Sequence, residues 1–232
     1  MEKFVVNTEE NLRLICGEYR EKFEAFRAYL LEFNEKYNLT AITGEKDVTY
    51  KHFLDSAAAR ELFFQGASVA EIGSGAGFPS VPLKILREDL RFTLFESVGK
   101  KCDFLRFIVD KLGFSGMNIC NMRSEDAARE KKYRENFDFA VARAVARMNV
   151  LCEYSMPLVK KGGAFIAYKS ADTAEIDEAK RAVKELGGEK TEIFPYALPE
   201  GYGERNLAVV KKVNQTPAKY PRGNGKERKQ PL

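Results

Sequence analysis

The sequence predicts an α/β protein with a largely parallel sheet and helices on both of its faces. From residue 65 onward, short apolar segments typical of strands alternate with helical segments over roughly 140 residues, as in a series of βαβ units. A glycine-rich segment follows the first of these strands directly. The composition, 44% hydrophobic and 31% charged, is typical of a chain that builds a core and excludes a fully disordered one.

The N-terminal part of the chain, residues 1–64, is predicted to be helical. Aromatic and apolar residues recur at steps of three and four from residue 8 to about residue 37, with charged residues between them. A second amphipathic stretch covers residues 46–64. Between the two, Asn38-Leu39-Thr40 interrupts the pattern.

The alternating part, residues 65–213, is predicted to form one domain. Its expected strands are 69–72, 92–95, 117–120, 137–142 and 164–168, and its expected helices are 79–86, 100–112, 150–159 and 174–186. Two further strands, 190–194 and 206–213, follow one another without a helix between them. That succession predicts an antiparallel pair at one edge of the sheet.

The remaining segment, residues 214–232, carries the whole net charge. It holds five of the 38 bases and one of the 34 acids, which leaves 33 of each in residues 1–213 and accounts for the net charge of +4. With three prolines and little to bury, it is expected to be an extended, solvated basic arm. Such an arm suits a polyanionic partner, and a tail that serves solubility alone is the alternative.

Several classes of protein are excluded or disfavoured. No apolar run approaches the roughly 18 residues of a membrane-spanning helix, and the N-terminus lacks the apolar core of a secretory signal. The four cysteines form no CxxC pair, and His52 is the one histidine, so a metal site or a Ser-His-Asp hydrolase is hard to build. We expect a cytoplasmic protein, a monomer with no metal and no membrane partner.

The glycine-rich segment, residues 71–79, is the strongest local signal. It reads ExGxGxG through Gly73, Gly75 and Gly77, and Phe78 stands where a dinucleotide-binding GxGxxG would have its last glycine. About twenty residues on, the next strand ends at Glu96, which can accept both hydroxyls of a ribose. A glycine turn and this acid, without provision for a diphosphate, indicate S-adenosylmethionine. A strand–helix turn that binds nothing is the alternative.

Two more strand ends are expected to face the same crevice. Ser124 and Glu125 follow the third strand and are candidates to hold adenine, although Ser124 can also be read as a helix N-cap. Arg143 follows the fourth strand and is expected to point into the site, with a plain surface position as the alternative.

At this point the motifs resemble those of a known family. EIGSGAGFPSVPL (71–83), LFESVGKKCDFLRF (94–107), RSED (123–126), FDFAVARAVA (137–146) and YGERNLAVVKK (202–212) occur in one order, after NEKYNLTAI (34–42) and KHFLDS (51–56). Together they closely resemble the bacterial small-subunit rRNA guanine-N(7) methyltransferases, also called the glucose-inhibited division protein B family. The segment TPAKYPR resembles an extension that some members carry.

The resemblance implies a class I methyltransferase fold with a seven-stranded sheet and an N-terminal helical addition. It implies S-adenosylmethionine as donor and one guanine of 16S rRNA, or of the small ribosomal subunit, as acceptor. Carried over by motif, Gly73 and Phe78 line the donor pocket, Glu96 takes the ribose, and Ser124 with Glu125 frames the adenine. Arg143 lies at the reaction side, as a donor-binding residue that aligns the reactants rather than as a general base.

Residues that could grip RNA are sought among polar groups near the crevice, because a target base must leave its stack before its N7 is accessible. The candidates are Asn38, Lys51, His52, Asp55, Lys169 and Arg205, with Arg222 on the basic arm. Competing interpretations stay open: Asn38 as a helix C-cap, His52 as a buried structural histidine and Asp55 as the ion-pair partner of a basic residue.

Two other classes of function compete with a methyltransferase. One is an RNA-binding or assembly factor with a vestigial donor pocket, against which the intact glycines and Glu96 argue. The other is a nicotinamide-dependent oxidoreductase, against which the missing GxGxxG argues.

Overall fold

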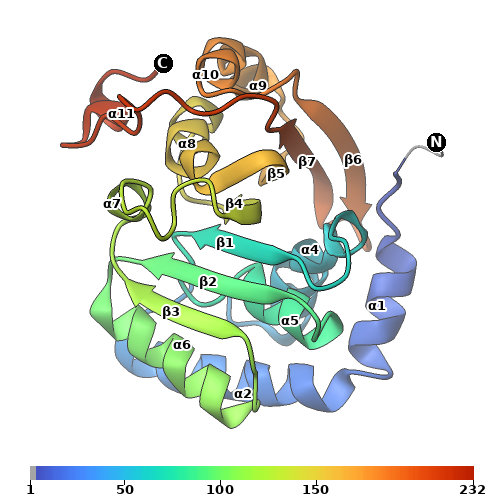
Figure 1. The fold of residues 1–232 in the computed structure, drawn as a ribbon. Coiled ribbons are helices and arrows are strands. Elements are labelled where there is room, and N and C mark those ends of the chain that lie inside the picture. The colour runs from blue at the N-terminus through green and yellow to red at the C-terminus, as the bar shows by residue number, and fades with distance from the viewer. Residues whose placement is uncertain (1–3) are drawn as a thin grey trace.

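A single seven-stranded sheet organises the chain in the computed structural model, which describes residues 4–232 (Figure 1). The first three residues of the predicted helical section lie outside the described residues. The strands are β1 (Ser68–Ile72), β2 (Arg91–Glu96), β3 (Met117–Asn121), β4 (Phe137–Arg143), β5 (Val159–Ser170), β6 (Glu192–Leu198) and β7 (Gly203–Lys211). Their order across the sheet is β3-β2-β1-β4-β5-β7-β6.

Five strands are parallel and the last two are not. β3, β2, β1, β4 and β5 pair in parallel, whereas β7 is antiparallel to both β5 and β6. The first six residues of β4 are all buried, as expected of a central strand covered on both faces. The α/β class and the antiparallel edge pair are thus confirmed.

Helices cover both faces of the sheet, and an apolar core lies between the sheet and the helices on each face. One core joins the N-terminal helices to α5 (Ser80–Leu86) and α6 (Gly99–Lys111) through side chains such as Phe26 and Phe104. The other lies beneath α8 (Met148–Ser155), η3 (Met156–Leu158), α9 (Ala174–Glu178) and α10 (Lys180–Glu185). Two short helices, α7 (Ser124–Ala127) and α11 (Lys226–Lys229), complete the set beside α8.

The N-terminal section is more broken than the sequence predicted. The expected helix over residues 8–37 is divided into α1 (Thr8–Cys16) and α2 (Arg20–Tyr37). Gly17 ends α1 with φ −115° and ψ −100°, and a Cβ there would lie 2.7 Å from the Arg13 carbonyl oxygen. The helical periodicity continues across this break, so side-chain spacing alone could not reveal it.

The second predicted stretch, 46–64, is a chain of short turns rather than one helix. It comprises α3 (Glu45–Asp47), the π-helical η1 (Val48–Leu54), α4 (Asp55–Ala57) and the 3₁₀ turn η2 (Arg60–Leu62). The wider π-helical turn places His52, Phe53 and Leu54 all in the interior. π-helical segments of this kind are frequent at functional sites.

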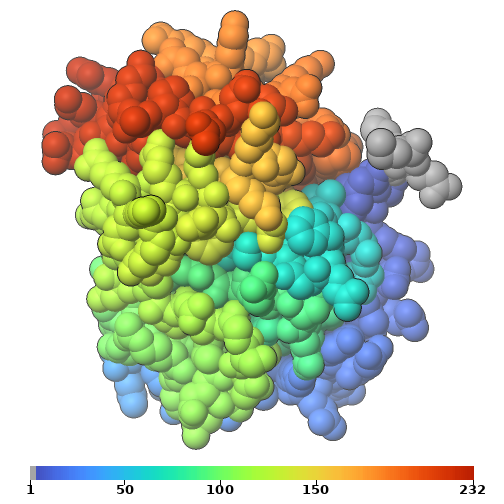
Figure 2. Space-filling model, viewed as in Figure 1, coloured from blue at the N-terminus to red at the C-terminus, as the bar shows by residue number. Residues whose placement is uncertain are grey.

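The expectation of an extended, solvated C-terminal arm is wrong. Residues 214–232 cross the α8 side of the molecule, drawn in red in Figure 1, and adjoin the yellow-green surface in Figure 2. Tyr220 is 4% exposed, and Thr216 and Glu227 are buried as well. We refer to residues 214–232 as the C-terminal segment.

Charged side chains of the body hold the C-terminal segment in place. Arg134 donates to the carbonyl oxygens of Thr216 (2.9 Å) and Tyr220 (2.8 Å). Glu153, itself 1% exposed, accepts from Arg222 through Nε at 3.0 Å and Nη2 at 2.7 Å. The composition gives the number of charges in this segment, but it does not show which residues of the folded body pair with them.

Candidate functional site

The glycine turn joins β1 to the region of α5 and exposes bare backbone at the carboxyl edge of the sheet. Gly73, Gly75 and Gly77 have φ angles of +64°, +57° and +86°, in the left-handed region that favours glycine. A Cβ at Gly75 would meet no other atom nearer than 3.9 Å, whereas at Gly73 it would lie 2.9 Å from a Val145 methyl group. The turn therefore offers an uncovered backbone for a ligand at Gly75.

Glu96 ends β2 with its carboxylate against this turn. One oxygen accepts from the Gly75 N–H at 2.9 Å and the other from the Val98 N–H at 2.8 Å. Each carboxylate oxygen has a second lone pair, so the group can shape the turn and still accept from a ribose hydroxyl. The predicted position of Glu96 beside the glycines is what the structure shows; its role toward a ligand stays a prediction.

Glu71 supports the same turn from beneath. Its side chain is fully buried, and one of its oxygens accepts from the Ser80 N–H at 3.1 Å. Burial raises the pKa of Glu71 to about 7, with the hydroxyls of Ser80 and Ser74 opposing that rise. The carboxyl group thus belongs to the scaffold of the turn.

A cavity of about 80 Å³ lies at the carboxyl edge beside Gly73, and we call it the donor-side cavity. Ser124 and Glu125 line it, as predicted for residues that follow the third strand. Ser124 is not the N-cap of α7; Arg123 holds that position, and Ser124 begins the helix with its side chain buried. The cavity is small beside the roughly 300 Å³ and more of typical ligand sites.

Arg143 ends β4 and joins three segments of the chain. Its Nη1 donates to the Lys51 carbonyl oxygen and to Asp55 Oδ2, both at 2.8 Å. Its Nη2 lies 2.9 Å from His52 Nδ1, and its guanidinium carbon lies 5.1 Å from the centre of the Phe78 ring. Cation–π contact and three hydrogen bonds therefore fix the guanidinium.

His52 is held as a neutral imidazole. Arginine has only donors, so His52 Nδ1 accepts from Arg143 and the ring proton resides on Nε2, which donates to Thr40 Oγ1 over 2.9 Å. Burial, and then the nearby Arg143 charge, lowers the pKa of His52 to about 3. The ring stacks on Phe78 with centroids 4.2 Å apart. Both ring nitrogens are hydrogen-bonded to protein groups, so neither is free to accept a proton from a substrate.

A second cavity of about 520 Å³ brings most of the RNA-side candidates together, and we call it the acceptor-side cavity. Its lining includes Lys51, His52, Asp55, Arg143, Lys169 and Arg205. Four cationic side chains and two carboxylates, with Glu175 the second, surround the space. This balance favours an anionic ligand.

The other groups around this cavity are held by protein partners. Asp55 accepts from the Tyr196 hydroxyl at 2.7 Å as well as from Arg143. This matches the alternative interpretation of Asp55 as the partner of a basic residue. The Lys169 ammonium donates to the Ala146 carbonyl oxygen (2.9 Å) and pairs with Glu175 (3.1 Å). These bonds give the cavity fixed walls.

Two candidates lie elsewhere. Asn38 is the C-cap of α2, with φ +49° and its N–H bonded to the Asn34 carbonyl oxygen, as the capping interpretation predicted. Arg222 lies in the C-terminal segment, where its guanidinium pairs with the buried Glu153. The structure brings neither of them to the acceptor-side cavity.

The donor-side and acceptor-side cavities are lined by neighbouring residues of one loop. Val145 lines the first and Ala144 lines the second, directly after β4. Sequence reasoning missed Thr40, Tyr196 and Tyr154, which support or line these cavities from distant segments. The NLT motif was the one signal that could have drawn attention to Thr40.

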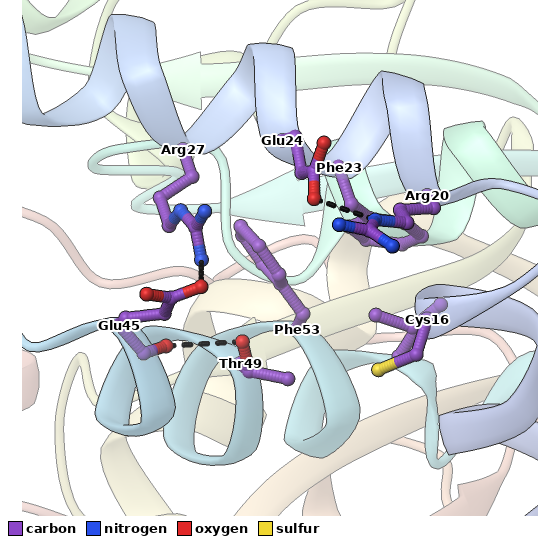
Figure 3. Close-up of a pocket in the computed structure, with 9 residues that line it drawn as sticks. Cys16, Arg20, Phe23, Glu24, Arg27, Glu45, Thr49 and Phe53 are labelled. Carbon is purple, nitrogen blue, oxygen red and sulfur yellow. Dashed lines mark hydrogen bonds and ion pairs between the residues drawn. The ribbon is translucent and has the colours of Figure 1, made fainter.

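A third cavity, of about 200 Å³, lies between α1, α2 and η1, and has a different character (Figure 3). Arg27 points to Glu45 and Arg20 to Glu24, in ion pairs of 2.7 Å each, while Phe53 lies between them. Its charges neutralise one another.

Two further surveys concern metals and membranes. Within residues 4–232, no three side chains among His, Cys, Asp and Glu gather as a metal ion would require. No helix in that part of the chain is both long and apolar enough to cross a membrane.

The fold defines the class of protein. An O-methyltransferase from Bacillus cereus, solved in complex with SAH, matches with a TM-score of 0.57 at 19% identity, over 81% of this chain and 91% of its own. A SAM-dependent O-methyltransferase from Thermotoga maritima matches with a TM-score of 0.55 at 14% identity, over 80% and 72%. The chain has the class I, Rossmann-like fold of S-adenosylmethionine-dependent methyltransferases.

Sequence comparison then identifies the family. The family described as GidB, rRNA small subunit methyltransferase G, matches residues 19–201. Proteins named Ribosomal RNA small subunit methyltransferase G are 42% identical over 236 residues in Lactobacillus acidophilus, covering 100% of this chain and 98% of the relative. In Brevibacillus brevis the identity is 45% over 216 residues, covering 92% and 91%. The chain belongs to this family, and its methyl donor is S-adenosylmethionine.

Proposed function

We propose that the protein transfers a methyl group from S-adenosylmethionine to N7 of one guanine in 16S rRNA. The observation that carries this proposal is that adjacent residues, Ala144 and Val145, line two cavities, one rimmed by cations and the other beside the glycine turn. We further propose that its partner is the small ribosomal subunit or the rRNA of that subunit. The enzyme would act in the cytoplasm as a monomer.

The donor site is assigned to residues that the glycine turn gathers. The uncovered backbone at Gly75 and the carboxylate of Glu96 fit an adenosyl group with its ribose hydroxyls. Ser124 and Glu125 would hold the adenine, and Gly73 and Phe78 the rest of the donor. When bound, the donor supplies a methyl group that is already activated by a positively charged sulfur.

The acceptor chemistry requires no base from the protein. Guanine N7 carries a lone pair in the ring plane and can attack a methyl group without first losing a proton. His52 and Asp55 have their polar atoms engaged by protein partners, as expected of a site that positions rather than deprotonates. Alignment of this kind can contribute on the order of 7–11 kcal/mol to catalysis.

Arg143 is the residue that we assign to alignment. Guanine presents O6 beside N7, and an arginine N–H can donate to O6 while N7 stays free for reaction. The bonds of Arg143 to Lys51, His52 and Asp55 hold the guanidinium in one orientation. Lys169 and Arg205, on the same cavity, would contact phosphate or base edges.

The test is methyl transfer from labelled donor to small subunits from cells that lack this protein, followed by nucleoside analysis. We expect one labelled nucleoside, 7-methylguanosine, in 16S rRNA. Labelled nucleosides of another kind would contradict the N7 assignment. Absence of both donor binding and rRNA methylation would favour the competing view of an assembly factor with a vestigial donor pocket.

Glu96→Gln provides the matching site variant. The amide keeps one acceptor oxygen but loses the charge, so donor affinity should fall roughly tenfold or more while RNA affinity stays unchanged. Asp138→Asn is the control, because Asp138 accepts from the Ser68 N–H at 2.8 Å in the same way but at the opposite end of the sheet. Equal loss of donor affinity in both variants would mean that Glu96 is only structural.

A further inference from the structure

The donor-side cavity has a wall that does not come from the methyltransferase sheet and its adjoining loops. Arg228 of α11 lines this cavity together with Tyr154 of α8, Ser124 and Glu125. Figure 1 shows α11 beside α7 and α8, at the end of the path that the C-terminal segment takes from β7. The last helix of the chain thus lies at the mouth of the site assigned to the donor.

The position of α11 is fixed by contacts on either side of it. Before α11, Arg222 is bound to Glu153 by three side-chain hydrogen bonds, and Arg129 donates to the Pro221 carbonyl oxygen at 2.8 Å. Within α11, Glu227 is fully buried and accepts from the Gly223 N–H. One carboxylate oxygen of Glu227 has no hydrogen-bond partner among the described residues. Arg228, next to the buried Glu227, is exposed and lines the cavity.

The groups around this wall form a small charged set. Burial raises the pKa of the Tyr154 hydroxyl, the neighbouring Arg228 guanidinium opposes that rise, and the charges of Glu125 and Glu227 add to it. Tyr154 therefore lies among all three charged side chains. Within the cavity, Arg228 supplies donors and Glu125 supplies acceptors.

That pairing is complementary to adenine. Each polar edge of adenine places its amino group, a donor, beside a ring nitrogen that accepts. A carboxylate next to a guanidinium presents the opposite pattern. A planar guanidinium can also stack on a purine ring. Arg228 lines the same cavity as the residues assigned to adenine. It would therefore face the adenine end of the donor, away from the positively charged sulfur.

We propose that the C-terminal segment completes the donor pocket and that Arg228 binds the adenine of the donor. This inference rests on the proposed donor site. It gives the positive charge of the segment a role in binding the methyl donor, where the sequence pattern suggested rRNA.

The test compares Arg228→Ala with Lys229→Ala in the full-length protein, using S-adenosylhomocysteine as the probe in calorimetry. Both variants remove one exposed positive charge from α11, but only Arg228 lines the cavity. We expect Arg228→Ala to weaken binding about tenfold, Lys229→Ala to change it less than about twofold, and the ligand-free melting temperatures to agree.

The other outcomes separate this inference from the proposed function. Equal affinity in the two variants, with a wild-type protein that binds, would overturn the role of Arg228 and leave the donor site standing. Loss of rRNA affinity alone in Arg228→Ala would overturn it in favour of a phosphate contact. A wild-type protein that does not bind the probe would overturn both.

Discussion

At the scale of single residues, the site depends on polar groups that bind one another before any ligand arrives. Arg143 connects the end of β4 with the π-helical turn through Lys51, His52 and Asp55, at distances of 2.8–2.9 Å. Removing one partner of such a set leaves the others buried and unpaired, which is costly. The N-terminal section is therefore tied to the sheet at the site itself.

Glu71 gives a prediction about the pH dependence of stability. Its carboxyl group has a pKa of about 7 in the folded protein, against 4.5 in the unfolded chain. The folded state thus holds the proton more tightly, and stability falls as pH rises from about 4.5 to about 7, by up to roughly 3 kcal/mol. Glu71→Gln should remove this fall.

The measurement is the free energy of unfolding of both proteins in urea from pH 5 to about pH 8. His52 contributes with the opposite sign, because its lowered pKa makes stability rise with pH up to about 6.5. The difference between wild type and variant cancels that contribution. Parallel curves for the two proteins would show that Glu71 does not titrate in this range.

At the scale of elements, the turn between β1 and α5 is defined by backbone conformations that few residues can adopt. Gly77 has φ +86°, and a Cβ there would lie 2.5 Å from a Val81 methyl group and 3.2 Å from one of Leu105. The turn is thereby packed against both α5 and α6. Its shape is set by the helices behind it as well as by its own glycines.

Gly77→Ala should therefore destabilise the protein more than a positive φ alone explains. Gly162→Ala is the matched control, since Gly162 has φ +89° but nothing within 4 Å of a Cβ. We expect a loss of about 1–2 kcal/mol for the control and a further 1–3 kcal/mol for Gly77→Ala. Equal unfolding free energies in the two variants would show that α5 moves aside without cost.

Much of this element scale could be predicted from the sequence. The alternation of strands and helices, the antiparallel edge pair and the position of Glu96 beside the glycines follow from periodicity and from the geometry of parallel sheets. The break at Gly17 could not be predicted, because the apolar spacing continues on both sides of it. The π-helical turn that buries His52 leaves no mark on that spacing either.

At the scale of the whole molecule, the C-terminal segment was the largest departure from expectation. Its composition indicates a solvated arm, but Tyr220 and Arg222 meet partners in α10 and α8, Glu185 and Glu153. Such pairings join residues far apart in the chain, and a single sequence does not reveal them. The same is true of Arg228 at the donor-side cavity.

Arg134→Ala tests whether this packing is cooperative with the body. Arg134 donates to four carbonyl oxygens, those of Ala128, Thr216, Pro217 and Tyr220. Its loss leaves buried acceptors unpaired, at about 1–3 kcal/mol, and should let trypsin cut at Lys219 before it attacks the sheet. Limited proteolysis with mass spectrometry gives the order of cleavage. Cleavage at unchanged rates would mean that the other anchors suffice.

The placement of α11 has a consequence for genetic variation. All seven strands are complete at Lys211, the side-chain hydrogen bonds that anchor the C-terminal segment extend as far as Glu227, and Leu232 adds one partly buried apolar contact beyond them. A nonsense or frameshift allele that alters only the final five codons would thus yield a chain that folds and accumulates normally. Under the role inferred for Arg228, such an allele would still be a loss of function, with a raised KM for the methyl donor as its mark.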